Sequence, residues 1–220
     1  MCLSSLIHIT NMKKFLLFLS IALAASVPMT AASLIAVNLT TDPAAATEAG
    51  FTNWEATTGS SAPSDLDLGG GITVSLVAFS SHNGNVTTTN RGGDDGYTGV
   101  LPSLTQEYWG APATYATAAT IGSFTFEIAG LAAGDYAWTS WHHDHGNGSG
   151  GGQTGLIDIE VSVNGGSTWT TPITDHDITR LDEVLTPATF SFTANGTDSV
   201  RIRITNDSAV TDGFQNWIIV

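Results

Sequence analysis

Apolar and polar residues alternate one by one in many short segments of this chain of 220 residues. In residues 123–128, Phe124, Phe126 and Ile128 alternate with polar residues. Because successive side chains of a β-strand point to opposite faces, each such segment is expected to form a strand with one buried and one solvated face. The same alternation occurs in residues 72–76, 136–138, 157–163, 190–192 and 200–204, and residues 34–39 are expected to form the opening strand.

The segments between these strands are rich in Gly, Asn, Asp, Ser and Pro, and no long amphipathic helix is expected. Asn164-Gly165 and Asn195-Gly196 are typical of tight turns. One short helix is expected over residues 103–108, with Ser103 as its cap. Many half-buried strands, short connections and no repeat predict an all-β fold, an antiparallel β-sandwich.

The first 32 residues have the pattern of an export signal. Lys13 and Lys14 precede the apolar run 15–25, and small residues follow at 30–32, where a signal peptidase would cut. The apolar run is too short to cross a membrane as a helix. We therefore expect residues 1–32 to be a signal peptide and residues 33–220 to be a single domain of a secreted bacterial protein, extracellular or at the cell surface.

The charge of the expected mature domain limits its partners. Both lysines lie in the signal, which leaves four arginines against 20 acidic residues and a net charge of −16. So acidic a domain is repelled by phosphate backbones and anionic lipid, which argues against nucleic acid and membrane partners. The single cysteine, Cys2, also lies in the signal, so the domain has no disulfide, thiol nucleophile or cysteine zinc site.

The apolar run 217–220 ends the chain. It is expected to be either a final edge strand or the end of a truncated sequence that continues into an anchor or a further domain. The sequence leaves both open.

A family resemblance adds to the fold prediction. Residues 131–138, which lead to His142, His143 and Asp144, resemble the "L-x-x-G-x-Y-x-V/W" strand of galactose-binding-like and malectin-like jelly-roll domains of secreted bacterial proteins. Residues 90–93, with 104–109 downstream, are similar to the arginine-glycine loop and short helix that precede that strand. The resemblance spans residues 34–220. It implies a jelly roll that binds carbohydrate, like a carbohydrate-binding module.

The densest cluster of polar residues follows this strand, at Trp141, His142, His143, Asp144 and His145. His143 and His145 share one face and suit a metal, with a site completed by Asp144 or by residues 175–177. Alternatively, Trp141 contacts a sugar ring while His and Asp side chains bind its hydroxyls. In a third interpretation these histidines bind no ligand and are either solvated or hydrogen-bonded to backbone groups of the loop.

Two further groups are candidates for binding. The loop that contains Arg91, Asp94 and Asp95 is rich in oxygen ligands and glycine, which suits a structural Ca²⁺; a solvated acidic turn is the alternative. Tyr108 and Trp109 form either an aromatic platform for a ligand or a plug at one end of the sandwich.

One hairpin motif and several absent motifs complete the pattern. Residues 162–169 resemble the Asp-box hairpin "S-x-D-x-G-x-T-W", a folding device, with Asn164 in the Asp position. The letters of residues 146–151 fit a dinucleotide fingerprint, but no helix is expected after them. The chain has no Gly-x-Ser-x-Gly elbow, His-Glu-x-x-His motif or Walker loop.

Three hypotheses about function follow, of which the first is favoured. The domain is a secreted, non-catalytic β-sandwich module that binds a polysaccharide or glycan through loops at one end. The expected contacts are residues 141–145, Arg91 with the loop to Asp95, and Tyr108 with Trp109. Alternatively, the domain is a metal-dependent hydrolase or lyase that uses residues 142–145. The third hypothesis is a purely structural surface or matrix protein.

Overall fold

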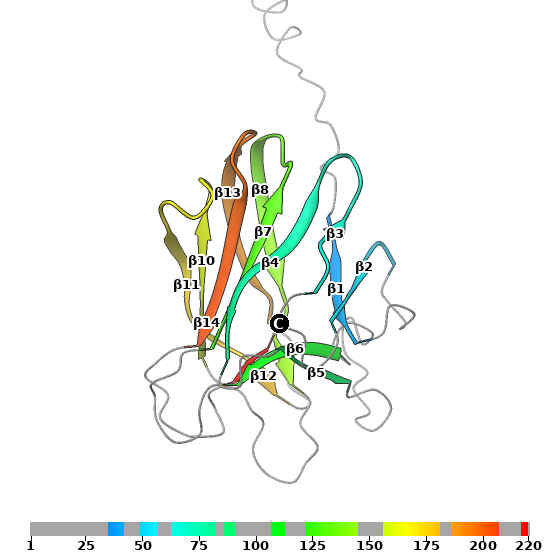
Figure 1. Ribbon diagram of the computed structural model, residues 1–220. Coiled ribbons are helices and arrows are strands. Elements are labelled where there is room, and N and C mark those ends of the chain that lie inside the picture. The colour runs from blue at the N-terminus through cyan, green and yellow to red at the C-terminus, as the bar shows by residue number, and fades with distance from the viewer. Residues whose placement is uncertain are drawn as a thin grey trace, which may run out of the picture. The chain divides into compact units, whose positions relative to one another are not determined.

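A computed structural model describes residues 35–41, 49–56, 63–81, 86–90, 107–112, 122–144, 156–180, 186–206 and 217–219 (Figure 1). All of them belong to one compact unit, Ile35–Val220. Within these ranges the regular elements are β-strands, most of them paired antiparallel, so the predicted all-β fold is confirmed. The same ranges contain no helix able to cross a bilayer.

The largest sheet places the predicted strands side by side in the order β11-β10-β14-β7-β4-β3, all antiparallel. Its members are β3 (Leu66–Asp67), β4 (Thr73–Ser80), β7 (Ser123–Ala129), β10 (Leu156–Ser162), β11 (Thr170–Asp177) and β14 (Val200–Asn206). In β14 buried and half-buried residues alternate along the whole strand, as the period-two pattern predicts.

The core of the domain lies on the inner face of this sheet. Ile204 of β14 lies opposite Phe124 of β7 and Ile159 of β10, and all three side chains are at most 1% exposed. The next inward pair along β14, Ile202 and Phe126, repeats the arrangement. Each fully buried side chain of this size contributes about 1.5–3 kcal/mol to folding. The register is therefore set by the apolar rows, since a slip of one residue would expose them.

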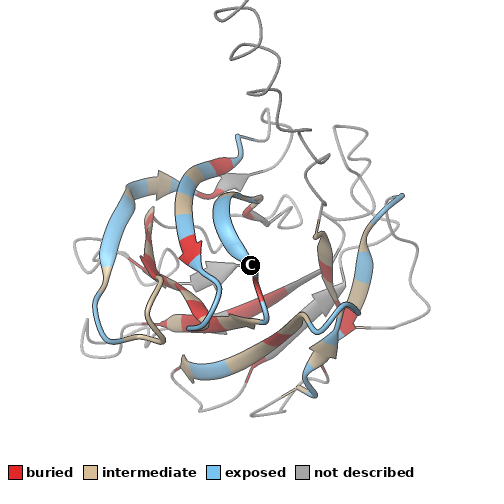
Figure 2. Cartoon of the chain, turned by 90° about the horizontal axis from the view of Figure 1, so that it is seen from above, coloured by how far each residue is buried: buried red, intermediate tan, exposed pale blue. Residues whose placement is uncertain are grey.

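A second layer covers this face. It consists of β8 (Ala133–Ser140) and β13 (Ala188–Asn195), paired antiparallel. Tyr136 stacks on Phe192, with ring centroids 5.6 Å apart, and Trp138 stacks on Phe190 at 6.4 Å. These four rings pack against the core, while the alternate residues of both strands are mostly exposed (Figure 2). The strand connectivity of a jelly roll, which the family resemblance implies, stays a prediction.

Three smaller sheets complete the described part of the chain. β1 (Val37–Thr40) pairs in parallel with β2 (Thr52–Glu55), and β9 (His143–Asp144) pairs in parallel with β12 (Thr179–Arg180). β6 (Glu107–Pro112) lies between β5 (Thr87–Asn90) and β15 (Trp217–Ile219). The opening strand thus begins at Val37, three residues later than the predicted strand.

The short helix predicted over residues 103–108 is wrong at its end. Glu107 and Tyr108 begin β6 and pair with Asn90 and Thr89; residues 103–106 lie outside the described ranges. At Glu107 and Tyr108 the helix prediction fails because the next residue, Trp109, is buried from a strand.

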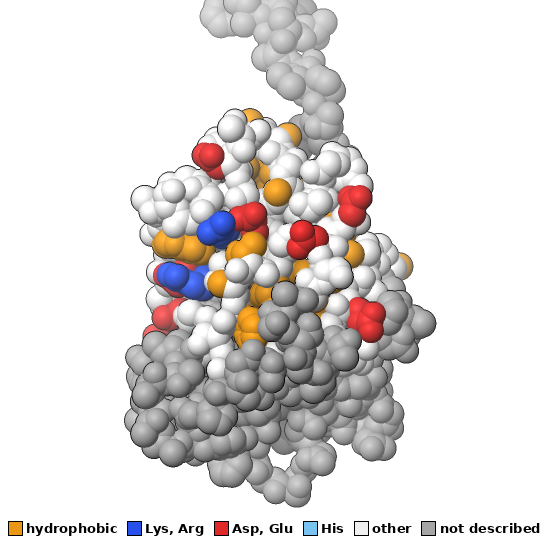
Figure 3. Space-filling model, viewed as in Figure 1, with side chains coloured by type: hydrophobic (Ala, Val, Ile, Leu, Met, Phe, Trp, Pro, Cys, Tyr) orange, Lys and Arg blue, Asp and Glu red, His pale blue; other side chains and the backbone are white. Residues whose placement is uncertain are grey.

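The outer face of the large sheet carries paired charges. Arg201 Nε contacts Glu127 Oε2 at 2.6 Å, whereas Arg203 holds Glu160 with two bonds, Nε to Oε2 at 2.5 Å and Nη2 to Oε1 at 2.8 Å. The hydrogen bonds to Glu160 raise the pKa of Arg203 above its ordinary value. Figure 3 shows basic side chains of this face beside acidic and hydrophobic ones.

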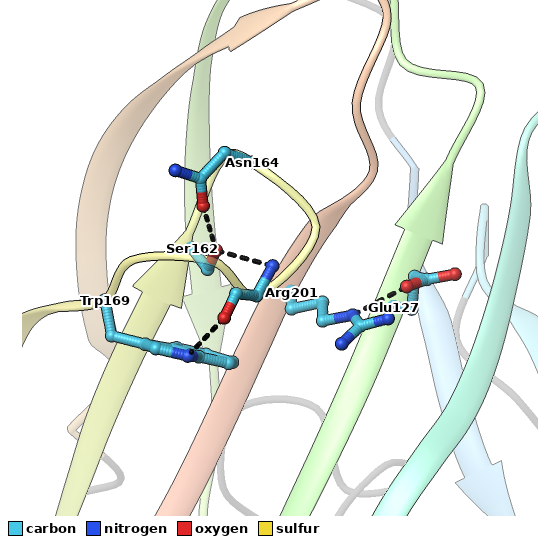
Figure 4. A network of polar contacts seen from close by, with 6 residues as sticks. Glu127, Ser162, Asn164, Trp169 and Arg201 are labelled. Carbon is cyan, nitrogen blue, oxygen red and sulfur yellow. Dashed lines mark hydrogen bonds and ion pairs between the residues drawn. The ribbon is translucent and has the colours of Figure 1, made fainter.

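The hairpin between β10 and β11 is held by the residues of the Asp-box-like motif (Figure 4). Asn164 Oδ1 accepts hydrogen bonds from Ser162 Oγ and the Thr168 backbone N–H, both at 2.9 Å, and Asn164 Nδ2 donates to Thr168 Oγ1 at 2.8 Å. Ser162 Oγ accepts from the Gly166 N–H at 2.8 Å. Asn164 therefore supplies the acceptor that this turn needs and adds a donor of its own. Gly165, with φ of 66°, confirms the predicted turn.

The edge strand β11 is protected against pairing with other chains. Pro172 lacks a backbone N–H, and a bulge at Asp175 interrupts the regular pairing with β10. Both features are typical of edge strands that avoid aggregation.

A pair of glycines with nearly equal backbone angles tests the packing between β4 and β7. Gly130 has φ of 80°, and a Cβ there would lie 2.0 Å from the carbonyl oxygen of Gly71. Gly69 has φ of 78° and open space around it. We expect Gly69→Ala to cost about 1 kcal/mol through backbone strain alone. Gly130→Ala should cost about 1–3 kcal/mol more because of the overlap. Urea denaturation measures both; equal losses would contradict the close approach.

Candidate functional site

A chain of hydrogen bonds marks the end of β8. Trp138 and Ser140 share one face of this strand, and His142 follows two residues later. Trp138 Nε1 donates to Ser140 Oγ at 3.0 Å, and Ser140 Oγ lies 2.9 Å from His142 Nε2. Because an indole can only donate, the serine oxygen accepts there and its own hydrogen is available to the imidazole. These hydrogen bonds hold the His142 side chain, which is 1% exposed, in one orientation.

A bulge in the neighbouring layer brings a second histidine to this place. His176 pairs with Ile157 and Ile173 pairs with Ile159, so two residues of β11, Thr174 and Asp175, oppose one residue of β10. Asp175 has φ of 53°, which is rare for a residue other than glycine. Its backbone N–H donates to Asp158 Oδ1 at 3.0 Å.

The consequence of the bulge is the direction of the His176 side chain. Cross-strand partners share a face, so His176 lies on the inner face with the fully buried Ile157. Without the extra residue, alternation from Ile173 would turn Asp175 inward instead. β-Bulges re-aim side chains in this way next to functional sites. The rings of His142 and His176 meet edge to face, with centroids 5.8 Å apart and planes at 70°.

The surroundings of His176 favour its neutral form. Burial lowers the pKa of His176 below 6.5, and the charge of Asp177 opposes this effect in part. Its Nε2 atom is buried and has no hydrogen-bond partner among the described residues. A buried polar atom in that state costs free energy, and such atoms are uncommon in folded proteins.

The parallel pair β9–β12 joins the two polar segments of the chain. His143 pairs with Thr179 and Asp144 with Arg180, directly after the segments that contain His142 and His176. Residues 142–144 and 175–177, which the sequence suggested as partners, thus lie at the same end of the sheets. The side chains of His143 and Asp144, and all of His145, lie outside the described residues.

The two predicted aromatic contacts differ in exposure. Trp141 is partly exposed at the end of β8. Trp109 is 0% exposed; its Nε1 donates to the Thr40 carbonyl oxygen at 3.2 Å, and its ring lies 4.9 Å from that of Trp54. The prediction that Trp109 forms an exposed platform is therefore wrong. Its side chain extends from β6 into the core and packs against β1 and β2. The side chain of Tyr108 lies outside the described residues.

The calcium prediction concerns the loop that contains Arg91, Asp94 and Asp95. These three residues lie outside the described ranges. Within those ranges, no group of three or more His, Cys, Asp or Glu side chains could hold a metal ion. Ca²⁺ and the metal roles of His143 and His145 therefore stay predictions.

The sequence interpretation missed Ser140. Alternation alone could have found it, because Trp138, Ser140 and His142 are spaced by two. The distance from Ser140 to His142 is in the range of a nucleophile and its base. Here, however, the imidazole is buried and the serine oxygen accepts from an indole, so the contact orients His142 and presents no open serine.

Comparisons with known proteins give little guidance. No protein-family model and no curated protein matches the chain. One solved structure that matches is the enzymatically active domain of bacteriophage CBA120 tailspike protein 4, at 12% identity and a TM-score of 0.34. The match covers 67% of this chain and 18% of the tailspike chain. A likeness at this level supports no conclusion about fold family or function.

Substitutions at Asp175 test the bulge. Asp175→Gly should leave the free energy of unfolding within about 0.5 kcal/mol, since glycine adopts positive φ freely. Asp175→Val should cost about 1–3 kcal/mol, because a β-branched residue is strained there. Thr174→Val, in the same bulge, is the matched control and should change little. The measurement is urea denaturation, and an Asp175→Val variant as stable as the control would argue against the bulge.

The lowered pKa of His176 predicts a pH dependence of stability. The unfolded chain, with the ordinary pKa of 6.5, binds a proton before the folded chain does. The free energy of unfolding should thus be highest above pH 6.5 and fall as the pH drops from there through the lowered pKa. His176→Gln should lose this part of the pH dependence. NMR titration of His176 gives a direct check: a pKa above 6.5 would contradict the burial.

Proposed function

We propose that the domain is a non-catalytic carbohydrate-binding module whose ligand contacts the strand ends around Trp141 and His142. The observation that carries the proposal is that the partly exposed Trp141 directly precedes His142 in the chain. At this strand end Trp138, Ser140 and His142 are linked by hydrogen bonds, and the His176 ring lies 5.8 Å from that of His142. Sugar sites combine an apolar ring face with a few oriented hydrogen-bonding groups. A ligand hydroxyl that reached His176 Nε2 would also satisfy the one buried polar atom that lacks a partner among the described residues.

The proposed ligand set is smaller than the one the sequence suggested. Trp141 and the half-buried His176 form its described part. His143, Asp144, His145, Arg91 and Tyr108 belong to it as predicted contacts. Trp109 and His142 do not, because their side chains are 0% and 1% exposed. The proposal includes export of the chain with removal of residues 1–32, which would place the domain where polysaccharides are found.

The second candidate is a metal-dependent hydrolase or lyase. The approach of His142 to His176 favours it, because imidazoles of neighbouring strands are common metal ligands. The two candidates differ in composition: the second needs a stoichiometric metal in the purified protein, and elemental analysis decides that.

Trp141→Ala tests the proposed module. If Trp141 stacks on the sugar, the variant should bind about tenfold more weakly or worse, as for other central aromatic contacts. The measurement is calorimetry or affinity electrophoresis on plant and marine polysaccharides. Trp141→Phe keeps a ring and should retain most of the affinity. Unchanged binding by Trp141→Ala, or no binding by the unaltered chain, would refute the proposal.

A further inference from the structure

The outer face of the large sheet carries two ion pairs, one of which lies against a tryptophan ring. The members of this group are Glu127, Glu160, Trp169, Arg201 and Arg203, which we call the β14 face. Arg201 pairs with Glu127 of β7, and Arg203 pairs with Glu160 of β10, so the two ion pairs extend to opposite sides of β14. This face lies on the side of the sheet away from Tyr136, Trp138, Phe190 and Phe192.

We propose that the β14 face binds a neutral saccharide chain. The proposal rests on the proposed carbohydrate-binding function and deepens it by naming a second surface and the charge class of the ligand.

The β14 face is rigid before any ligand arrives. Arg203 is held by two bonds to Glu160, and its guanidinium lies 4.3 Å from the ring centroid of Trp169. Trp169 Nε1 in turn donates to the Gly166 carbonyl oxygen at 3.1 Å, within the hairpin that Ser162 and Asn164 stabilise. Side chains already held in place lose little conformational entropy when a ligand binds.

The charged side chains of the β14 face are held in place yet remain accessible to a ligand. The side chains of Arg201 and Arg203 are 34% and 35% exposed, and those of Glu127 and Glu160 are 23% and 19% exposed. Figure 3 shows basic, acidic and hydrophobic side chains open to the viewer on this face of the molecule. Bonds of this kind on a protein surface contribute little to stability, about 0–1 kcal/mol each. Stability alone therefore gives little reason for such ordered pairs.

The charge of this surface selects the ligand. The chain carries a net charge of −14, whereas the two ion pairs of the β14 face each cancel their own charge. Asp158, on the same face of β10 two residues before Glu160, leaves the surroundings of these pairs acidic. An anionic polymer would meet the repulsion of the whole domain and arginines that are already paired. A cation would meet carboxylates that are already neutralised. A neutral polyhydroxyl chain offers donors to the carboxylates and acceptors to the guanidinium groups. Its C–H groups can contact the part of the half-buried Trp169 indole that the Arg203 guanidinium does not cover.

The experiment measures binding of the purified chain to three neutral probes, a β-1,4-glucan, a xylan and a mannan, by affinity electrophoresis and calorimetry. Trp169→Ala should weaken binding about tenfold or more, as expected for an aromatic anchor. The double variant Glu160→Gln with Arg203→Gln keeps the face neutral but removes its charged hydrogen bonds, and should weaken binding to a similar extent. It also keeps the proposal testable if Trp169→Ala does not fold.

Two controls accompany these variants. Trp169→Phe keeps a ring and should lose much less affinity than Trp169→Ala. Thr189→Ala removes an exposed polar group from the opposite layer and should change nothing. A sulfated or uronic polysaccharide should bind more weakly than the neutral probes.

The outcomes separate this proposal from the one before it. If Trp141→Ala abolishes binding while both β14-face variants bind as the unaltered chain does, the β14 face is refuted and the strand-end site stands. If the β14-face variants lose binding and Trp141→Ala does not, the opposite holds. Binding of none of the probes, or tighter binding of the anionic one, would overturn the proposal for the β14 face.

Discussion

Burial of the inner face of β14 is the constraint on which the rest of the structure depends. Val200, Ile202 and Ile204 are 0–1% exposed, and each lies in register with an apolar residue of β7. Because strands alternate strictly, the burial of these three side chains also decides what the other face presents. Arg201 and Arg203 point outward for the same reason that the isoleucines point inward. The hydrophobic core and the charged outer face are thus two results of one alternation.

The strand-end cluster depends on where that alternation stops or is interrupted. Along β8 the inward positions change from aromatic Tyr136 and Trp138 to polar Ser140 and then His142, so the inner face becomes polar at its end. On β11 the bulge at Asp175 shifts the alternation by one position and brings His176 to the same place. An imidazole pair arises between two layers, although neither strand by itself presents two histidines inward. This arrangement requires a strained backbone at Asp175 and leaves the buried Nε2 atom of His176 without a partner among the described residues.

The domain is acidic and has few arginines, and two of these arginines form ion pairs on the outer face of the large sheet. Arg201 and Arg203 are both held by glutamates of neighbouring strands, one on each side of β14. The result is two ordered ion pairs in a chain of net charge −14. One of them lies against the Trp169 ring, and Trp141 directly precedes His142 at the strand ends. Recognition of an uncharged polar ligand at either place is what we propose.

The sequence by itself determined the all-β class, most strand positions, the tight turn at Asn164-Gly165 and the two polar segments that meet at the strand ends. These features follow from local rules, because period-two alternation and turn chemistry act over a few residues. Only the tertiary structure decided that Trp109 is buried, that residues 107–108 belong to a strand, and that His176 points inward. Each of these depends on partners far along the chain: the Thr40 carbonyl oxygen for Trp109, and the Asp158 carboxylate for the bulge before His176. Contacts between such distant residues leave no periodic signal in a single sequence.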